Sequence, residues 1–419
     1  MNKERKQRRD KAKPSLGVAL GGGGPMGGVY QIGALRALDE ALEGLDLNDL
    51  DAYVGVNAGS FVAANLANQI TPSQMCRIFV RNESDIHPFH PEVFYRPALL
   101  EYAARAKAIP KLLFDALSNV VKNPTDQTLL ESLTVMAQAV PSGVFDNTGF
   151  HDYISRSYSS LGRTNDFARL RRKLLVIASD VESGETIRFG EDGLQHVPIS
   201  KAIQSSMASP GLYVPVELNG HYYMDGTLNK GMHTSVAFED GADIVFAINP
   251  VVPIDVSHAV KSGTMERDEL TKSGMPNVLS QAYRTMVHSR LTSGLKSIQR
   301  DFPGKEVLLF EPSRNDASLF FSSVFSFNAR KRMCEEAYQI TRANLRERAD
   351  ELSTLLAPSG IRLRRDILDD TERTLSTGLY GEALPIFKAK IKSFEPKDTQ
   401  EVVVDSYLAR VTQRVVSIF

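Results

Sequence analysis

The sequence contains few of the residues that mark secreted, membrane-spanning or metal-stabilised proteins. Only two cysteines occur in 419 residues, Cys76 and Cys334, and two isolated thiols supply neither a disulfide framework nor the ligand spacing of a zinc site. Tryptophan is absent, which by itself excludes little. No apolar run approaches the ~18 residues that span a bilayer, so we expect no transmembrane helix. These absences favour a reducing compartment, and the expected location is cytoplasmic.

The sequence also lacks a strong charge imbalance. Its formal net charge is −1, so no global field attracts nucleic acid, and we expect no nucleic-acid partner. Residues 1–14 are the exception, because they carry seven Lys and Arg side chains and almost nothing apolar. Without the apolar core of a signal peptide, this segment is predicted to be a solvated, disordered tail. The alternative is an electrostatic tether that makes peripheral contact with anionic membrane lipids.

The remaining composition, 42% hydrophobic and 24% charged, is ordinary for a globular protein. Buried strands are predicted to alternate with helices in the first part of the chain. The predicted strands span residues 15–20, 52–56, 173–178 and 242–249, and the predicted helices include 29–43, 60–68 and 199–206. This alternation predicts an α/β domain over residues 15–255, with a mostly parallel sheet covered by helices.

Two further regions of the chain have a helical pattern. Residues 71–142 are predicted to be a helical insertion, in which Pro110 divides residues 98–117 into two helices. This insertion is either a cap that faces substrate or part of the core. Residues 256–419 are predicted to be mainly helical. Their predicted elements are long helices at 278–298 and 328–355, a strand at 306–310 and a mixed helical end from 360 onward.

A glycine-rich segment, GGGGPMGG at residues 21–28, follows the first predicted strand. Gly22, Gly24 and Gly27 satisfy G-x-G-x-x-G, but no acidic residue ends the second strand to bind a ribose, and the lysine of a P-loop is absent. Flexible glycines at a helix N-terminus instead expose backbone N–H groups that stabilise an oxyanion. The alternative is a tight turn without a ligand.

The second predicted strand ends in Gly55-Val56-Asn57-Ala58-Gly59. A strand, a sharp turn with glycines on both sides and a helix form the layout of a nucleophile elbow, whose central residue should be serine. Asn57 occupies that place, and an amide offers no group that can attack a carbonyl. Ser60 lies one helical turn further on and should point away from the elbow tip, so we do not expect it to replace the nucleophile.

A candidate base follows a hairpin around Asn219-Gly220. Asp225 ends the second strand of that hairpin and is followed by Gly226, so its carboxylate lies at a strand terminus with little steric cover. Alone, an Asp-Gly pair is an ordinary turn. None of the eight histidines lies in a clear strand-end loop with a partner acid, and His87 and His90 lack a third ligand, so no metal is expected.

Taken in order, the glycine loop, the elbow and Asp225-Gly226 resemble the patatin-like phospholipase family. Residues 30–38, 178–185 and 202–211 agree with that family, and the resemblance covers roughly residues 16–253. It implies a three-layer α/β fold, a Ser-Asp dyad that hydrolyses acyl esters of lipids, and no metal or organic cofactor. The oxyanion loop would then comprise Gly22, Gly23, Gly24, Gly27 and Gly28. Asn57 stands where the family has its nucleophile, Asp225 stands at the base, and Met26 lies near a place where the family usually has Arg or Lys.

Three functional hypotheses follow from these patterns. The first is an acyl hydrolase scaffold that is inactive or nearly so, because Asn57 replaces serine. The second is a non-catalytic lipid-binding or scaffold protein at a membrane surface. The third, a nucleotide-binding module, is the weakest, because the ribose acid and the P-loop lysine are both missing. The sequence assigns no particular lipid and no oligomeric state, and it leaves open whether Asn57 is natural or introduced.

Overall fold

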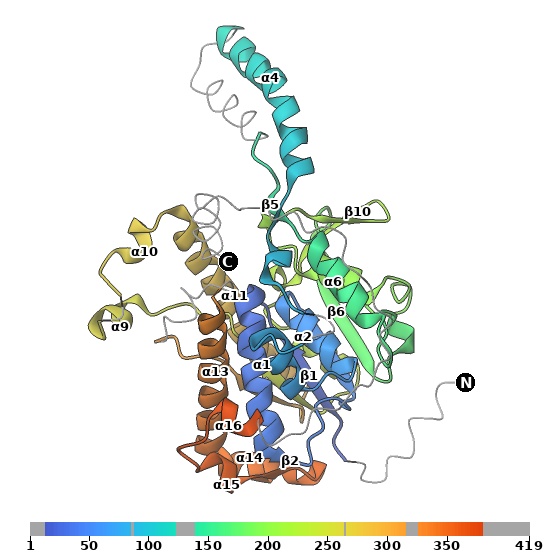
Figure 1. The fold of residues 1–419 in the computed structure, drawn as a ribbon, viewed down its shortest axis with the longest axis vertical. Coiled ribbons are helices and arrows are strands. Elements are labelled where there is room, and N and C mark those ends of the chain that lie inside the picture. The colour runs from blue at the N-terminus through green and yellow to red at the C-terminus, as the bar shows by residue number, and fades with distance from the viewer. Residues whose placement is uncertain (1–12, 85–87, 123–138, 264, 316–325, 380–419) are drawn as a thin grey trace.

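The computed structural model describes residues 13–84, 88–122, 139–263, 265–315 and 326–379, and its centre is one eight-stranded sheet (Figure 1). The strand order is β12-β11-β1-β3-β6-β10-β9, with β7 paired to β6. The strands are β1 (Leu16–Leu20), β3 (Ala52–Val56), β6 (Lys173–Asp180), β7 (Thr186–Phe189), β9 (Val216–Leu218), β10 (His221–Asp225), β11 (Ile244–Ile248) and β12 (Glu306–Phe310). The first five strands in the spatial order are mutually parallel, and β7, β9 and β10 pair antiparallel. The predicted mostly parallel α/β fold is therefore confirmed.

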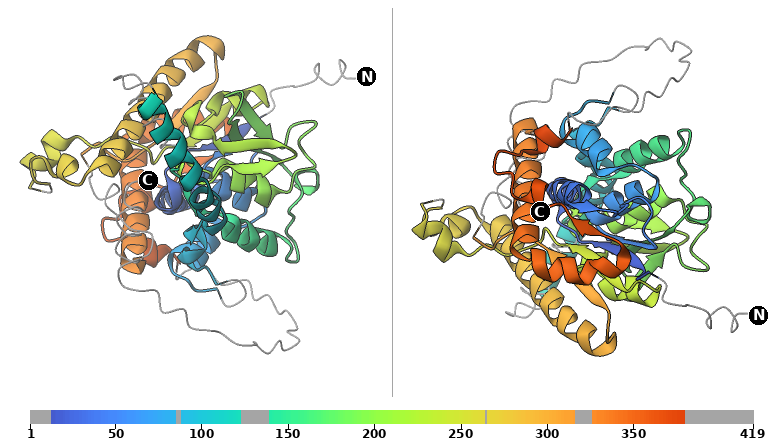
Figure 2. Two further views of the ribbon diagram at one scale, coloured as in Figure 1. Left: turned by 90° about the horizontal axis from the view of Figure 1, so that it is seen from above. Right: turned by 90° about the horizontal axis from the view of Figure 1, so that it is seen from below.

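Alternate side chains of the central strands pack into two separate cores, because successive strand residues point to opposite faces. One core contains Val18 of β1 and Tyr53 of β3, together with α1 (Gly24–Ala41), α2 (Ala58–Ala67) and α13 (Phe327–Glu347). The other contains Ala19 and Val54, together with α8 (Thr234–Glu239) and the C-terminal part of α11 (Met275–Asp301). Helices therefore cover both faces of the sheet, which makes three layers (Figures 1 and 2).

The remaining elements are short, apart from α4 (Leu99–Lys122). The other helices are α3 (Pro72–Met75), α6 (Thr148–Tyr158), α7 (Ile199–Ser206), α9 (Val256–Lys261), α10 (Glu269–Lys272), α14 (Ala349–Leu356), α15 (Arg365–Leu368) and α16 (Leu375–Leu379). Small sheets form from β2 (Leu42–Glu43) with β13 (Arg362–Leu363), and from β4 (Arg96–Pro97), β5 (Gly143–Asp146) and β8 (Gly211–Tyr213). The C-terminal region contributes β12 to the central sheet, so the sheet crosses the predicted domain boundary at residue 255.

Three predicted helix boundaries are wrong. The first helix begins at Gly24 rather than at residue 29, so most of the glycine-rich segment lies inside α1. Pro110 does not divide the insertion, because α4 (Leu99–Lys122) continues through it. Pro110 and Ala106 are both exposed, so water can solvate the carbonyl that the proline leaves without a partner.

The long helix predicted at 328–355 is interrupted at Arg348, where α13 ends and α14 begins. Asp350 and Glu351 lie in the first turn of α14, where the helix dipole favours acidic side chains. Residues 123–138 of the predicted helical insertion lie outside the described residues, as does the chain after residue 379.

Candidate active site

The sheet brings the three predicted motifs to one edge. β1 and β3 are adjacent and parallel, with Leu20 paired to Gly55, so the glycine segment and the elbow leave the sheet side by side. On the far side of β3, Val56 pairs with Ile177 of β6, which places residue 57 level with Ala178. β10 pairs with β6 beyond the end of β3 and on the same side, because β7 occupies the other side of β6, and there Asp225 is the partner of Ala178. Asn57 and Asp225 therefore lie next to each other on the same side of β6, at the carboxyl ends of the parallel strands where open α/β sheets bind ligands.

The backbone at Asn57 has the strained geometry of an elbow. Its φ of 54° and ψ of −126° are unusual for a residue with a side chain, although asparagine tolerates positive φ better than most. The flanking glycines allow this sharp turn. A Cβ atom at Gly55 would lie 2.4 Å from the carbonyl oxygen of Gly59, and one at Gly59 would lie 2.2 Å from that of Leu20. Both positions therefore exclude any larger residue.

The Asn57 side chain connects all parts of the site. Its Nδ2 donates to Oδ2 of Asp225 at 2.7 Å and to Oγ of Ser209 at 3.0 Å. Its Oδ1 accepts from the backbone N–H of Gly24 at 3.0 Å and from that of Ala58 at 2.7 Å. Because an amide has two donor hydrogens and two acceptor lone pairs, the hydrogen-bonding capacity of this side chain is fully used.

Asp225 is completely buried and surrounded by donors. Its Oδ1 accepts from the backbone N–H and the hydroxyl of Thr227 at 2.9 and 2.7 Å. Its Oδ2 accepts from Ser209 at 2.9 Å and from the Tyr283 hydroxyl at 3.4 Å, besides Asn57. Burial raises the pKa of Asp225 above its usual range, and the hydrogen bonds from Thr227, Ser209 and Asn57 oppose that rise.

The two serines nearest the elbow have structural partners. Ser60 is buried, and its hydroxyl donates to the backbone carbonyl of Asn57 at 2.5 Å, so it points away from the elbow tip. Ser206 accepts from the backbone N–H of Asn57 at 2.8 Å and donates to the carbonyl of Ile177 at 2.5 Å. Both hydroxyls are therefore engaged with the backbone of the elbow and of β6 rather than with Asp225.

The five glycines predicted to form the oxyanion loop differ in position. Gly24 supplies the N–H that reaches Asn57, and Gly22 lies against the site, since a Cβ there would be 2.7 Å from Cγ2 of Thr227. Gly23 precedes α1 with a φ of 105°, which glycine adopts without strain. Gly27 and Gly28 lie inside α1. Gly27 packs against the Gly22 backbone, where a Cβ would be 2.6 Å from the carbonyl oxygen. Gly226 packs equally closely, because a Cβ there would lie 2.6 Å from the Ile177 carbonyl oxygen.

Sequence reasoning missed three side chains of the site. Thr227 follows Asp-Gly directly, and a hydroxyl two residues after an aspartate is a common turn partner, so this signal was available. Ser209 lies in the segment 202–211 but had no assigned role. Tyr283 comes from α11, and its hydroxyl also contacts that of Thr227. Because 58 residues separate Tyr283 from Asp225, no local pattern announces its position.

A small apolar cavity adjoins the elbow. It measures about 30 Å³ and is lined by Ala58 together with residues from α1, α2, the insertion, α6 and the segment after α7. The lining residues are Pro25, Gly28, Val29, Ile32, Ala58, Phe61, Val62, Phe79, Phe89, Phe94, Phe150 and Met207. Its aromatic rings pack mainly edge to face, as Phe61 does against Phe79 and Phe150. The wall beside the elbow is therefore apolar, and the cavity in it has room for about one methyl or methylene group.

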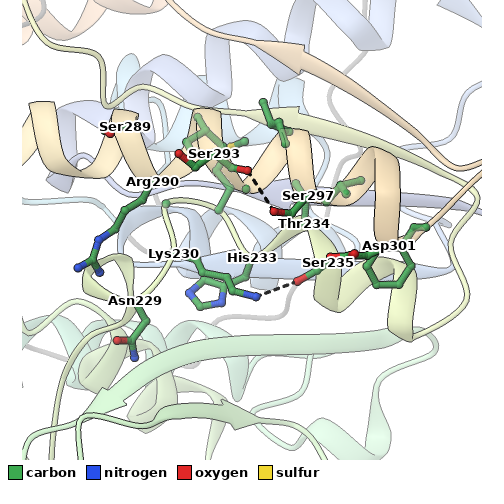
Figure 3. A pocket seen from close by; sticks show the side chains of 17 residues that line it. Asn229, Lys230, His233, Thr234, Ser235, Ser289, Arg290, Ser293, Ser297 and Asp301 are labelled. Carbon is green, nitrogen blue, oxygen red and sulfur yellow. Dashed lines mark hydrogen bonds between the residues drawn. The ribbon is translucent and has the colours of Figure 1, made fainter.

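A second cavity, of about 490 Å³, lies between residues 229–235 and α11 (Figure 3). Its lining is more polar and includes Lys230 and Arg290, and the Lys230 amine lies 3.4 Å from the Ser235 hydroxyl. His233 is buried at its edge and bonds the Gly226 carbonyl through Nε2 at 3.0 Å. Burial lowers the pKa of His233 to about 4, so this imidazole is neutral at physiological pH and donates that bond.

Within the described ranges, no group of three or more His, Cys, Asp or Glu side chains is placed to hold a metal ion. In the same ranges, no helix combines the length and apolarity needed to cross a bilayer. Residues 18–237, just over half of the chain, match the patatin-like phospholipase family. The chain belongs to this family. The patatin-like match runs from β1 into α8, so α11 and its Tyr283 lie outside it.

Among solved structures, the chain is similar to VipD from Legionella pneumophila. The two are 16% identical, the match covers 80% of this chain and 67% of VipD, and the TM-score is 0.36. The family assignment rests on the match over residues 18–237 and not on this likeness, whose TM-score is low.

Proposed function

We propose that this patatin-like chain carries the site of a Ser-Asp acyl hydrolase for lipid esters, and that Asn57 leaves it inactive or nearly so. One observation supports this most directly. A single side chain at position 57 bridges the Asp225 carboxylate and the backbone N–H groups of Gly24 and Ala58. These are the two kinds of partner that a nucleophile elbow needs, namely a base and an oxyanion hole.

The proposed chemistry of the family follows from serine at position 57. Its hydroxyl would give a proton to Asp225 and attack the ester carbonyl carbon. The N–H groups of Gly24 and Ala58 would stabilise the oxyanion. Collapse of this intermediate would expel the alcohol with the proton from Asp225 and leave an acyl-enzyme, which water would hydrolyse by the same steps in reverse. The apolar cavity beside Ala58, at about 30 Å³, has room for about one methyl or methylene group of the acyl chain.

In the chain as it stands, Asn57 blocks this chemistry in two ways. The amide supplies no nucleophile, so no acyl-enzyme forms. Its Oδ1 also occupies the N–H groups of Gly24 and Ala58, so a substrate carbonyl would have to displace it. Binding of the hydrocarbon chain can persist without either step.

Replacing Asn57 with serine tests the proposal. We expect the Asn57→Ser variant to hydrolyse a short-chain p-nitrophenyl ester and phospholipid vesicles roughly 10³-fold faster than the unchanged chain. Its circular dichroism spectrum should match that of the parent, whereas its unfolding midpoint should fall, because serine cannot keep all four hydrogen bonds of Asn57. An Asn57→Ser variant that folds normally but hydrolyses neither substrate above the parent level would overturn the proposal.

Two second-site variants in the Asn57→Ser background assign the roles. Asp225→Asn should abolish the gained activity, whereas Ser60→Ala should retain it, because Ser60 contacts only the elbow backbone. The pH profile supplies a further check. Asp225 acts as a base only when deprotonated, and burial raises its pKa, so activity should decline on the acid side at a pH above the usual aspartate range. An acid limb that persists unchanged in a residually active Asp225→Asn variant would exclude this carboxylate as the base.

A non-catalytic lipid-binding role is the second candidate. It is favoured by the complete hydrogen bonding of Asn57, since an amide with all its partners satisfied stabilises the site as it is. This role predicts that the unchanged chain binds a fluorescent fatty acid. A Cβ at Gly28 would have its nearest neighbour 3.7 Å away, so Gly28→Ala should fold, and its methyl group should take up most of the cavity. Equal fatty-acid affinity in both proteins would exclude this cavity as the binding site.

Peripheral membrane contact and a cytoplasmic location are part of this second proposal. The basic tail would supply an electrostatic tether, although residues 1–12 lie outside the described residues. Deletion of residues 1–14 should then weaken binding to anionic vesicles and leave fatty-acid binding unchanged. Equal vesicle binding with and without the tail would remove it from the proposal.

A further inference from the structure

The helix α4 presents large apolar side chains to solvent. Leu100 is 90% exposed, Phe114 is 72% exposed and Leu99 is 69% exposed. α4 leaves the body beside β5 and β10 and stands clear of the sheet and its covering helices (Figure 1). Single exposed apolar residues are common, but several of this size on one projecting helix mark an interaction surface.

Basic side chains share that exposed face. Lys107 and Lys111 are both exposed, and they lie between Leu100 and Phe114 at spacings of seven, four and three residues along the helix. At 100° per residue, these spacings place all four side chains within less than one third of a turn of one another. The outer face of α4 therefore combines apolar anchors with amines that can reach anionic groups.

The opposite side of α4 is already occupied. The Tyr102 hydroxyl donates to the Val144 carbonyl, and the Glu101 carboxylate accepts from the backbone N–H and hydroxyl of Ser142 at 3.1 Å each. Leu112 is buried. These contacts hold the inner side of the helix toward the rest of the chain and leave the outer face without a partner among the described residues.

The base of α4 is continuous with the apolar cavity at the elbow. Phe94 lines that cavity and lies five residues before the helix begins. The centroid of its ring lies 4.4 Å from that of Phe150, which also lines the cavity. On the side toward the helix, it lies 6.1 Å from the ring centroid of Tyr95. Tyr95 in turn contacts Phe145 of β5, the strand beside which α4 emerges. A chain of aromatic side chains thus connects the exposed helix with the site.

We propose that α4 docks this protein on an anionic lipid surface. Leu100 and Phe114 would enter the boundary between headgroups and acyl chains, while Lys107 and Lys111 would lie among the anionic headgroups. A lipid surface fits this face better than a second copy of the chain, because two copies would bring the lysines of both faces together. Docking on lipid would bring the proposed lipid site to its substrate, so this proposal rests on the proposed function. Its test needs neither hydrolysis nor fatty-acid binding.

The absence of tryptophan from the sequence allows a clean measurement. Phe114→Trp places one indole on the outer face of α4, and its emission should move to shorter wavelength when phosphatidylcholine vesicles containing phosphatidylserine are added. The matched control is Leu161→Trp, at a position that is 94% exposed and lies after α6, well away from α4 in the chain. Its emission should stay unchanged. Equal shifts at both positions, or no shift at position 114, would overturn the proposal.

Vesicle co-sedimentation separates the two contributions to docking. Lys107→Gln with Lys111→Gln should weaken binding by about 25-fold, since each charge near an anionic surface contributes about fivefold. Leu100→Asp with Phe114→Asp should weaken it on the order of a hundredfold, because apolar burial is lost. Leu161→Asp should have no effect, and each effect should persist after deletion of residues 1–14. If vesicles without phosphatidylserine bind equally well, the lysines have no role and the anionic surface is excluded.

A self-association assay tests whether a second copy of the chain, rather than a lipid surface, binds the outer face of α4. Light scattering of the purified chain without lipid should give the same mass for the parent and for Leu100→Asp with Phe114→Asp. If the parent is a dimer and this variant a monomer, the face binds a second copy and the docking proposal fails. Hydrolysis of a soluble ester by Asn57→Ser requires no vesicles, so failure of docking and failure of the proposed function give different results.

Discussion

Residue 57 is the point at which the hydrogen bonds of the candidate site converge. The Asn57 amide presents two donors toward Asp225 and Ser209, and two lone pairs toward backbone N–H groups. Serine is smaller, and its hydroxyl both donates and accepts. The groups around position 57 can therefore form hydrogen bonds with either asparagine or serine.

This complementarity gives a stability prediction for Asp225→Asn. In the unchanged chain, the new amide must place its NH₂ group against either the Asn57 donor or the Thr227 donors. Either orientation leaves a buried donor facing another donor, which costs about 1–3 kcal/mol of unfolding free energy. In the Asn57→Ser background, the serine oxygen can accept from that NH₂ group, so the cost should be smaller.

Urea denaturation of the four proteins in this double-mutant cycle measures the difference. Removing the buried charge of Asp225 also changes stability, because burial disfavours its ionised form, but that term is common to both backgrounds. We expect a coupling of at least about 1 kcal/mol between positions 57 and 225. Additive effects would show that the Asn57–Asp225 hydrogen bond contributes nothing specific.

Among the elements, α1 depends on its close contact with α13. Gly33 lies where the two helices meet, and a Cβ there would be 2.2 Å from the Cys334 carbonyl oxygen and 3.0 Å from Cβ of Ala337. Since α1 also carries Gly24 at its first turn, this contact helps to position the oxyanion-hole candidate.

Gly33→Ala should therefore destabilise the protein, by about 1–3 kcal/mol, because the two helices must move apart. The matched control is Gly294→Ala in α11, where a Cβ would meet nothing within 4 Å. That substitution should stabilise by up to ~1 kcal/mol through helix propensity alone. Thermal unfolding of both variants is the measurement. If Gly33→Ala proves as stable as Gly294→Ala, the α1–α13 contact is looser than the structure shows.

The C-terminal region completes both the core of the molecule and the surroundings of the candidate site. β12 extends the sheet next to β11, α13 covers α1, and Tyr283 of α11 reaches Asp225. Residues 18–237 carry the patatin-like match, yet they do not contain these three contributions. The family segment and the C-terminal region therefore share one core.

A chain truncated after residue 255 tests this dependence. It loses the partner of β11 and the helix that covers α1, so we expect it to lack cooperative urea unfolding and a protected core in hydrogen exchange. Supplying residues 256–419 as a second chain during refolding should restore both properties. Cooperative unfolding of residues 1–255 alone, at the midpoint of the full chain, would instead show that this segment is an independent domain.

Local patterns predicted much of the fold. Strands β3 and β12 and helix α7 have the predicted bounds, because buried β-branched runs and a short amphipathic segment are local signals. Three helix boundaries could not be predicted locally, because they depend on the tertiary surroundings. The close packing of Gly27 on the Gly22 backbone and the bond from the Gly24 N–H to Asn57 let α1 begin among glycines. Exposure lets α4 pass through Pro110, and the interruption at Arg348 has no clear local signal. Propensity alone decides none of these, since tertiary contacts override it.

By itself, the sequence determined the family, the α/β class and the motifs that carry Gly24, Asn57 and Asp225, because each motif is a short pattern of residue types with its own backbone chemistry. Only the tertiary structure decided how they meet. The pairing of β6 with both β3 and β10 brings Asn57 within hydrogen-bond distance of Asp225, and α11 adds Tyr283 from outside the family segment. The physical reason is that strand register and helix packing join residues far apart in the chain, and no local spacing encodes those distances.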